Sequence, residues 1–237
     1  MMVLENEFVW RGVRSLDMGV VVQEMPGYKR PSRRLDKVAI PGRSGEVVED
    51  LFGHDVWEDV QYTLNLAVKP GYDRIAVLEW LSGDGELVLG SVPDSVYHAR
   101  IEVETPSNEI APGHPGSYLQ LAPTFVCSPW RYELFPRPAV DVLAGAAGRN
   151  PFDFSAAPLL RVEGAVGTVL AVAAGGRTLQ VRMTAASAVI DCDLEAADGA
   201  TTGGEFVQLP PGEWVAEVSV TSGAVSSVML EPRYRRV

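Results

Sequence analysis

Apolar and polar residues alternate along residues 60–68, the clearest such pattern in the first half of the chain. A period of two places the apolar side chains on one face of an extended strand and the polar ones on the other. We therefore predict one strand over residues 60–68 with a single buried face. The apolar positions on that face are Val60, Tyr62, Leu64, Leu66 and Val68.

Further short apolar runs in the first half are separated by Pro and Gly, which is typical of short strands joined by turns. They predict strands over residues 7–10, 18–23, 33–40, 86–89, 96–104 and 118–126. One helix is predicted over residues 72–81, because Ile75, Leu78 and Leu81 recur at intervals of three and Gly83 follows as a stop. Trp80 does not lie on the helix face formed by these three residues, so we expect its side chain to be free for contacts between subunits.

The second half has no helical periodicity, and Gly-rich turns interrupt it every eight to twelve residues. Short strands at this spacing indicate an antiparallel sandwich or barrel. A hairpin is predicted around the turn at residues 221–224. The predicted strands cover residues 159–162, 169–173, 178–183, 188–192, 205–209, 213–220 and 224–230.

A chain of 237 residues exceeds the usual size of one compact domain, which favours two hydrophobic cores. Residues 141–151 are rich in Ala and Gly, the composition of a flexible connector. We expect an N-terminal domain over residues 1–140, a linker over 141–151 and a C-terminal domain over 152–237. The predicted fold class is mainly β, with two domains and one short helix.

The charge and the hydrophobicity of the chain argue against nucleic acids and membranes as partners. The formal net charge is -11 and both halves carry an acidic excess, which argues against nucleic-acid binding through phosphate contacts. No apolar stretch reaches the roughly 18 residues that a membrane-spanning helix needs, so we expect no membrane insertion. The acidic N-terminus lacks the pattern of a secretory signal, so we expect synthesis and folding in a cytoplasm.

The segment Pro41, Gly42, Arg43, Ser44 and Gly45 is the sharpest local feature. It lacks the Lys-Ser/Thr ending and the helix of a phosphate-binding loop, so the phosphate interpretation is weak. Pro followed by Gly fits a type II turn, because Pro presets φ and Gly accepts a positive φ. We therefore predict a turn between the strand at residues 33–40 and a second strand from Glu46, with Arg43 at its exposed tip.

Other candidate chemistry is sparse, and we expect no catalytic residue, cofactor or metal. Asp191, Asp193 and Glu195 alternate and suggest either a calcium site or, more simply, a solvated strand face. Cys127 and Cys192 are expected to be buried free thiols. The three histidines lie far from each other and from the cysteines, which argues against a transition-metal site.

The order of several short motifs resembles the distal tail protein family of phages with long non-contractile tails, abbreviated Dit. Each motif consists largely of turn residues and strand ends, and their shared order extends over nearly the whole chain. In the first half they lie at residues 40–46, 80–87, 94–100 and 125–130. In the second half they lie at residues 150, 157–158, 190–191, 206–212 and 232–235.

This resemblance implies an N-terminal β-sandwich-like, ring-forming domain with one short helix and a C-terminal galectin-like antiparallel β-sandwich. It implies a structural, non-enzymatic protein that forms a homohexameric ring at the virion tail tip and is assembled in the host cytoplasm. The implied partners are other copies of the chain, the tail tube protein, the tail-associated hub protein, and baseplate or receptor-binding proteins. DNA would pass through the ring without specific binding. The residues 41–45 and Trp80 are the candidates for ring contacts.

A carbohydrate-binding, lectin-like module is the alternative, because the C-terminal sandwich resembles galectins in outline. Galectin-type recognition would need a cluster of His, Asn, Arg and Trp on one face of a sheet. The second half has no His, has Asn150 at its edge and has Trp214 as its single tryptophan.

Overall fold

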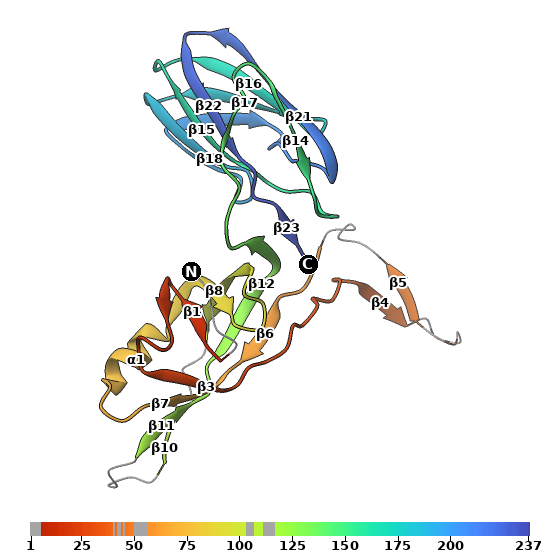
Figure 1. Cartoon of the computed structure of the whole chain (residues 1–237). Helices are drawn as coiled ribbons and strands as arrows, with labels where there is room; N and C mark the ends of the chain where they lie inside the picture. Colours follow the sequence, from red (N-terminus) through yellow and green to blue (C-terminus); the bar gives the residue numbers. More distant parts are fainter. Residues whose placement is uncertain are drawn as a thin grey trace. The chain divides into compact units, whose positions relative to one another are not determined.

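The computed structural model describes residues 6–39, 41, 44, 46–49, 56–102, 107–110 and 117–237. The chain divides into two compact units, Met1–Leu134 with Val237, and Phe135–Arg236. Both are built from antiparallel strands, and the described residues contain one short helix (Figure 1). The prediction of a mainly β protein with a single helix is confirmed.

The first unit contains two sheets around one core. Strands of the larger sheet lie in the order β2 (Val13–Arg14), β1 (Phe8–Trp10), β8 (Gly83–Leu89), β9 (Ser95–Ile101) and β12 (Thr124–Glu133), and β6 (Val60–Thr63) also pairs with β12. The smaller sheet has the order β10 (Ser107–Ile110), β11 (Tyr118–Leu121), β7 (Asn65–Val68) and β3 (Val20–Glu24). Its core is aromatic-rich, since Phe8, Trp10, Tyr62 and Phe125 are all fully buried.

The alternating segment 60–68 forms two strands in different sheets instead of the one strand predicted. Its five apolar residues are all buried, as the period of two requires. The ladder changes partner at Leu64, whose backbone N–H donates to the Pro123 carbonyl at 3.0 Å. The alternating pattern therefore predicted which side chains are buried. It could not predict the change of sheet between β6 and β7, because that change depends on which other strands pair with each of them.

Helix α1 (Arg74–Trp80) is shorter than predicted, and only part of the predicted apolar face is buried. Asp73 caps it by accepting hydrogen bonds from the backbone N–H groups of Ile75 and Ala76. The buried residues are Val77 and Leu81, whereas Ile75 is 68% exposed. Leu78 is half buried and packs against the same core, so the predicted apolar face is confirmed at Leu78 and Leu81 and wrong at Ile75.

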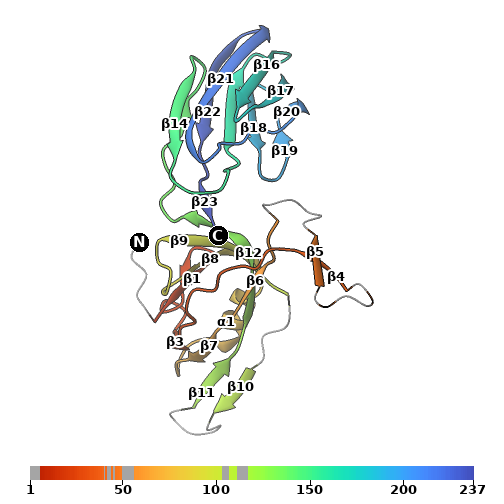
Figure 2. The same ribbon diagram turned by 90° about the vertical axis from the view of Figure 1, so that its right-hand side faces the viewer.

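The second unit, Phe135–Arg236, contains two five-stranded sheets, which Figure 2 shows from a second direction. One has the order β13 (Val140–Asp141), β22 (Val225–Glu231), β15 (Leu159–Gly164), β18 (Ser187–Asp191) and β19 (Ala196–Asp198). The other has the order β14 (Ala146–Asn150), β21 (Gly212–Ser222), β16 (Val169–Ala174), β17 (Arg177–Met183) and β20 (Ala200–Gly204). The short strand β23 (Arg235–Arg236) lies near the end of the chain.

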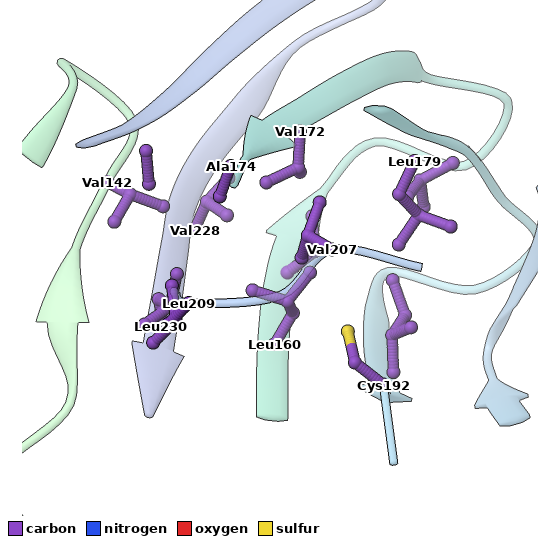
Figure 3. Packing of buried hydrophobic residues seen from close by; sticks show 14 of the residues in the cluster. Val142, Leu160, Val172, Ala174, Leu179, Cys192, Val207, Leu209, Val228 and Leu230 are labelled. Atoms are coloured by element: carbon purple, nitrogen blue, oxygen red, sulfur yellow. The ribbon is translucent and has the colours of Figure 1, made fainter. Parts of the chain in front are cut away.

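A hydrophobic core fills the space between these two sheets. Figure 3 shows aliphatic side chains such as Leu160, Val172 and Leu230 converging there. Buried residues recur every second position along β16 and β17 and over most of β15, and most of the residues between them are half buried or exposed. This unit is therefore an antiparallel β-sandwich, as the spacing of strands and turns predicted.

Three details of the second unit differ from the sequence-based predictions. Strands β21 and β22 do not form a hairpin, because they belong to opposite sheets and the turn between them crosses the sandwich. Residues 205–209 form only an isolated bridge, Ala156 to Leu209, although Val207 and Leu209 are buried. The expected linker 141–151 contains β14, which pairs with β21 over its full length, so this segment is part of the sandwich.

Candidate interaction surfaces

The Pro41–Gly45 segment lies at the end of a two-stranded ribbon. Strands β4 (Asp36–Ala39) and β5 (Glu46–Glu49) pair antiparallel, with Ala39 opposite Glu46. The strands predicted on either side of this segment therefore pair with each other, whereas most of the predicted turn lies outside the described residues. Pro41 and Ser44 are exposed, whereas Gly42, Arg43 and Gly45 lie outside the described residues.

The segments that lead into and out of this hairpin, residues 32–34 and 56–58, are also hydrogen bonded to each other. The backbone N–H of Arg34 donates to the Val56 carbonyl at 3.0 Å, and that of Glu58 donates to the Ser32 carbonyl at 2.9 Å. Among the described strands, β4 and β5 have no third partner and form a sheet of their own (Figure 1). A two-stranded ribbon is marginally stable on its own in water, so contacts with another chain would stabilise it.

Charged side chains of both signs line a shallow groove of ≈ 340 Å³ near the base of the ribbon. The Arg100 guanidinium donates to Asp59 at 3.1 Å and also to Glu102. In the same groove, the Arg34 Nε atom lies 3.9 Å from the Glu58 Oε1 atom. These side chains are about half exposed, and such surface ion pairs contribute little to folding.

Trp80 packs against the core of the first unit instead of facing solvent. Its ring stacks on Phe8 with centroids 5.6 Å apart, and its indole N–H donates to the Trp10 carbonyl at 3.2 Å. We expected the Trp80 side chain to be free because it lies off the predicted apolar face of the helix, and this expectation was wrong. Its role in subunit contacts stays a prediction.

Asp191 and Asp193 do not share one strand face, because β18 ends at Asp191 and a turn follows. The Asp191 carboxylate accepts hydrogen bonds from the backbone N–H groups of Asp193 and Leu194 and from Arg233 at 2.7 Å. Arg235 donates to Asp193 at 2.9 Å. The two carboxylates thus hold the C-terminal segment against the sandwich, and the described residues contain no cluster of His, Cys, Asp or Glu suited to a metal.

The partial burial of Asp191 acts to raise the pKa of its carboxyl group. The hydrogen bonds from Arg233 and from the backbone N–H groups of Leu194 and Asp193 outweigh that effect, so the pKa lies below its ordinary value. The charged form of Asp191 is therefore the form that the fold stabilises.

Several residues of the sequence motifs in the second half make buried or partly buried hydrogen bonds. The Trp214 indole N–H donates to the Tyr234 hydroxyl at 2.9 Å. The Asn150 amide donates to the carbonyls of Phe154 and Leu209 at 2.8 and 3.2 Å. The motif residues Asn150 and Tyr234 therefore join segments of the second unit that lie apart in the sequence.

The two cysteines are buried and free, as predicted. Desolvation is the main cause that raises the pKa of both thiols to about 12, so neither is activated as a nucleophile. In the part of the chain that the structure describes, no helix is long and apolar enough to cross a membrane.

No protein-family model matches this sequence, and no curated protein matches it. Among solved structures, the chain is similar to the crystal structure of the Dit protein (gp 19.1) of phage SPP1. The match has a TM-score of 0.62 and 15% sequence identity, and it covers 98% of this chain and 99% of that chain. The SPP1 protein is described as a paradigm of the hub adsorption apparatus in phages that infect Gram-positive bacteria.

The match extends through both units. The chain therefore has a Dit-like fold, mainly β, with two β-sandwich regions and one short helix, as the resemblance of the sequence motifs predicted.

Proposed function

We propose that this protein is a structural component of a phage tail tip, a distal tail protein of the baseplate hub without enzymatic activity. Six copies form a ring that joins the tail tube protein to the tail-associated hub protein. The second units hold baseplate or receptor-binding proteins. The observation that carries this proposal is the structural match to SPP1 Dit, which covers 98% of this chain and 99% of that chain.

The β4–β5 ribbon supplies the ring contact in this proposal. Its two strands leave both outer edges without a partner among the described strands, and backbone N–H and C=O groups at such edges readily pair with another chain. Pro41 and Ser44 are exposed in the connection between its strands. The charged groove formed by Arg34, Asp59 and Arg100 lies close to the base of the ribbon and adds ion pairs that salt would weaken.

Negative-stain electron microscopy and light scattering of the full chain test the proposal. We expect a six-lobed annulus and a mass near six copies of the 25.6 kDa chain. A particle of one copy at micromolar concentration would contradict a ring that assembles from this protein alone.

A shortened ribbon tests the contact itself. Replacement of residues 37–48 by a two-residue Asn-Gly turn keeps the pairing at the base of the ribbon and removes its outer part. We expect this variant to be monomeric with an unchanged free energy of unfolding. The control replaces the exposed Leu194 of the second unit by Ser, which should leave the ring intact. A ring formed by the shortened ribbon would place the contact elsewhere.

A further inference from the structure

One open edge of the second unit is built by a single segment that passes from one sheet to the other. Strand β13 pairs with β22, and β14 pairs with β21 in the opposite sheet. Between them the fully buried Val142 fills the gap in the core. The crossing is ordered by two local hydrogen bonds, Leu143 N–H to the Asp141 carboxylate and Gly145 N–H to the Val142 carbonyl, both at 2.9 Å.

A shallow groove of ≈ 550 Å³ runs along this edge. The side chains that line it are aliphatic or small, with one exception, and Val215 in its floor is 57% exposed. The exception is Glu217, which is exposed and gives the groove a negative charge. The lining residues are Leu143, Ala144, Gly145, Ala146, Ala147, Val215, Glu217 and Val218.

Strand β14 lacks the features that usually protect a sheet edge from pairing. Charged side chains, Pro, bulges and very short length are the common protections. Within the described strands, the edge strands β13 and β19 have only two and three residues, and β3 has a register shift at its end. Strand β14 has five residues in regular register with β21, without Pro or Lys, and its single charge is Arg149 near one end.

We propose that β14 binds an extended segment of a partner protein as an added sixth strand of its sheet. Backbone N–H and C=O groups of β14 that point away from β21 supply the hydrogen bonds, and alternate side chains of the segment enter the groove. Small or aliphatic side chains fit its apolar floor, and a Lys or Arg of the segment pairs with Glu217.

The occupant is a different protein and not a second copy of this chain. The exclusion of a second copy rests on the proposed ring. Pairing of β14 with β14 of another copy would be a two-fold contact, whereas neighbours in a cyclic ring meet through two different surfaces. Because the β4–β5 ribbon supplies the contact between neighbours in the proposed ring, all of the β14 edges stay open to a partner of the tail tip.

A displayed library of random peptides of about twelve residues, longer than a typical strand, is the probe for this site. It is selected against the full-length protein, and a labelled enriched peptide is then measured by fluorescence anisotropy. We expect enriched sequences to combine small or aliphatic residues at alternate positions with at least one Lys or Arg. Hydrogen exchange should slow at residues 146–150 when the peptide is bound.

Two variants separate the contribution of side-chain fit in the groove from that of charge. Ala147→Gln places a long neutral side chain in the groove and should weaken peptide binding by roughly tenfold, or about 1.4 kcal/mol. The matched control is Thr201→Gln on β20, the opposite edge of the same sheet, which should not change binding. Glu217→Lys should shift the selected peptides from basic to acidic residues.

Enrichment that is equal for the Ala147→Gln protein and the unaltered protein would overturn the proposal, and so would protection of amides outside the β14 edge. Electron microscopy of the same sample keeps the two proposals distinct. A ring without peptide binding at β14 would reject only the added strand. Peptide binding at β14 without a ring would reject the assembly and with it the argument that excludes a second copy.

Discussion

Trp10 and Trp80 exchange hydrogen bonds between indole and backbone. The Trp10 indole N–H donates to the Trp80 carbonyl at 2.9 Å, and the Trp80 indole N–H donates to the Trp10 carbonyl at 3.2 Å. Trp10 lies in strand β1 and Trp80 is the last residue of α1, so the pair joins the helix to the larger sheet. A carbonyl at the end of a helix has no partner within the helix, and here Trp10 supplies one.

Trp80→Phe tests this connection, since Phe retains the aromatic contact with Phe8 and loses the indole N–H donor. We expect the free energy of unfolding in urea to fall by about 1 kcal/mol. Trp10→Phe removes the other donor and should cost more, because it also leaves a cavity in the core where Trp10 is fully buried. The double variant should lose less than the sum of the single variants, since both bonds hold the same two segments together.

The same variants test whether Trp80 acts between subunits. A purely intersubunit role would leave unfolding of the monomer unchanged in Trp80→Phe and would abolish the ring. An intrachain role lowers the stability of the monomer and leaves assembly intact in native conditions.

The sequence predicted strand positions well wherever burial alone determines them. The apolar residues of the segment 60–68 are all buried, and β16 and β17 lie where their alternation placed them. Pairing partners were harder to predict, because a strand pattern specifies the buried face and leaves the neighbouring strand open. For this reason the change of sheet at Leu64 and the crossing between β21 and β22 were both missed.

For the candidate surfaces too, features set by neighbouring residues could be predicted from the sequence, and contacts between distant residues could not. The pairing of β4 with β5 could be expected because Pro41 and Gly42 favour a turn between two extended segments. The Arg233 and Arg235 contacts with Asp191 and Asp193 join residues about forty positions apart, which no local spacing reveals. The groove at β14 was missed because its Ala- and Gly-rich sequence also has the composition of a linker.

Gly148→Ala should destabilise the second unit. A Cβ at this position would overlap the indole ring of Trp214, which is buried and hydrogen bonded to Tyr234. Overpacking of this kind costs about 1 to 3 kcal/mol, measurable as a lower urea midpoint of the second unit. Gly203→Ala is the control, because a Cβ there meets no atom within 4 Å. Equal effects of the two substitutions would show that the contact with Trp214 is not the cause.

Asp191→Asn should remove a pH-dependent part of the stability. Because the pKa of Asp191 is below its ordinary value in the folded chain, its contribution is present above the unfolded pKa of about 4 and is lost as the pH falls through the folded pKa. The unaltered protein should therefore lose stability more steeply than Asp191→Asn below about pH 4. The measurement is thermal unfolding across this range, with the exposed Asp198→Asn as control. Parallel curves for the unaltered protein and Asp191→Asn would exclude this role.

Cys127 and Cys192 should react with an aromatic disulfide reagent only after unfolding. Desolvation raises the pKa of both thiols to about 12, so at pH 8 only about one thiol in ten thousand is ionised, and both side chains are shielded from the reagent. The native protein should release almost no chromophore over minutes, whereas the protein in concentrated urea should release two equivalents per chain within seconds. Cys127→Ala and Cys192→Ala should each halve the release in urea. Rapid reaction of one equivalent with the native protein would show that one thiol is accessible and ionised, and the single variants would identify which one.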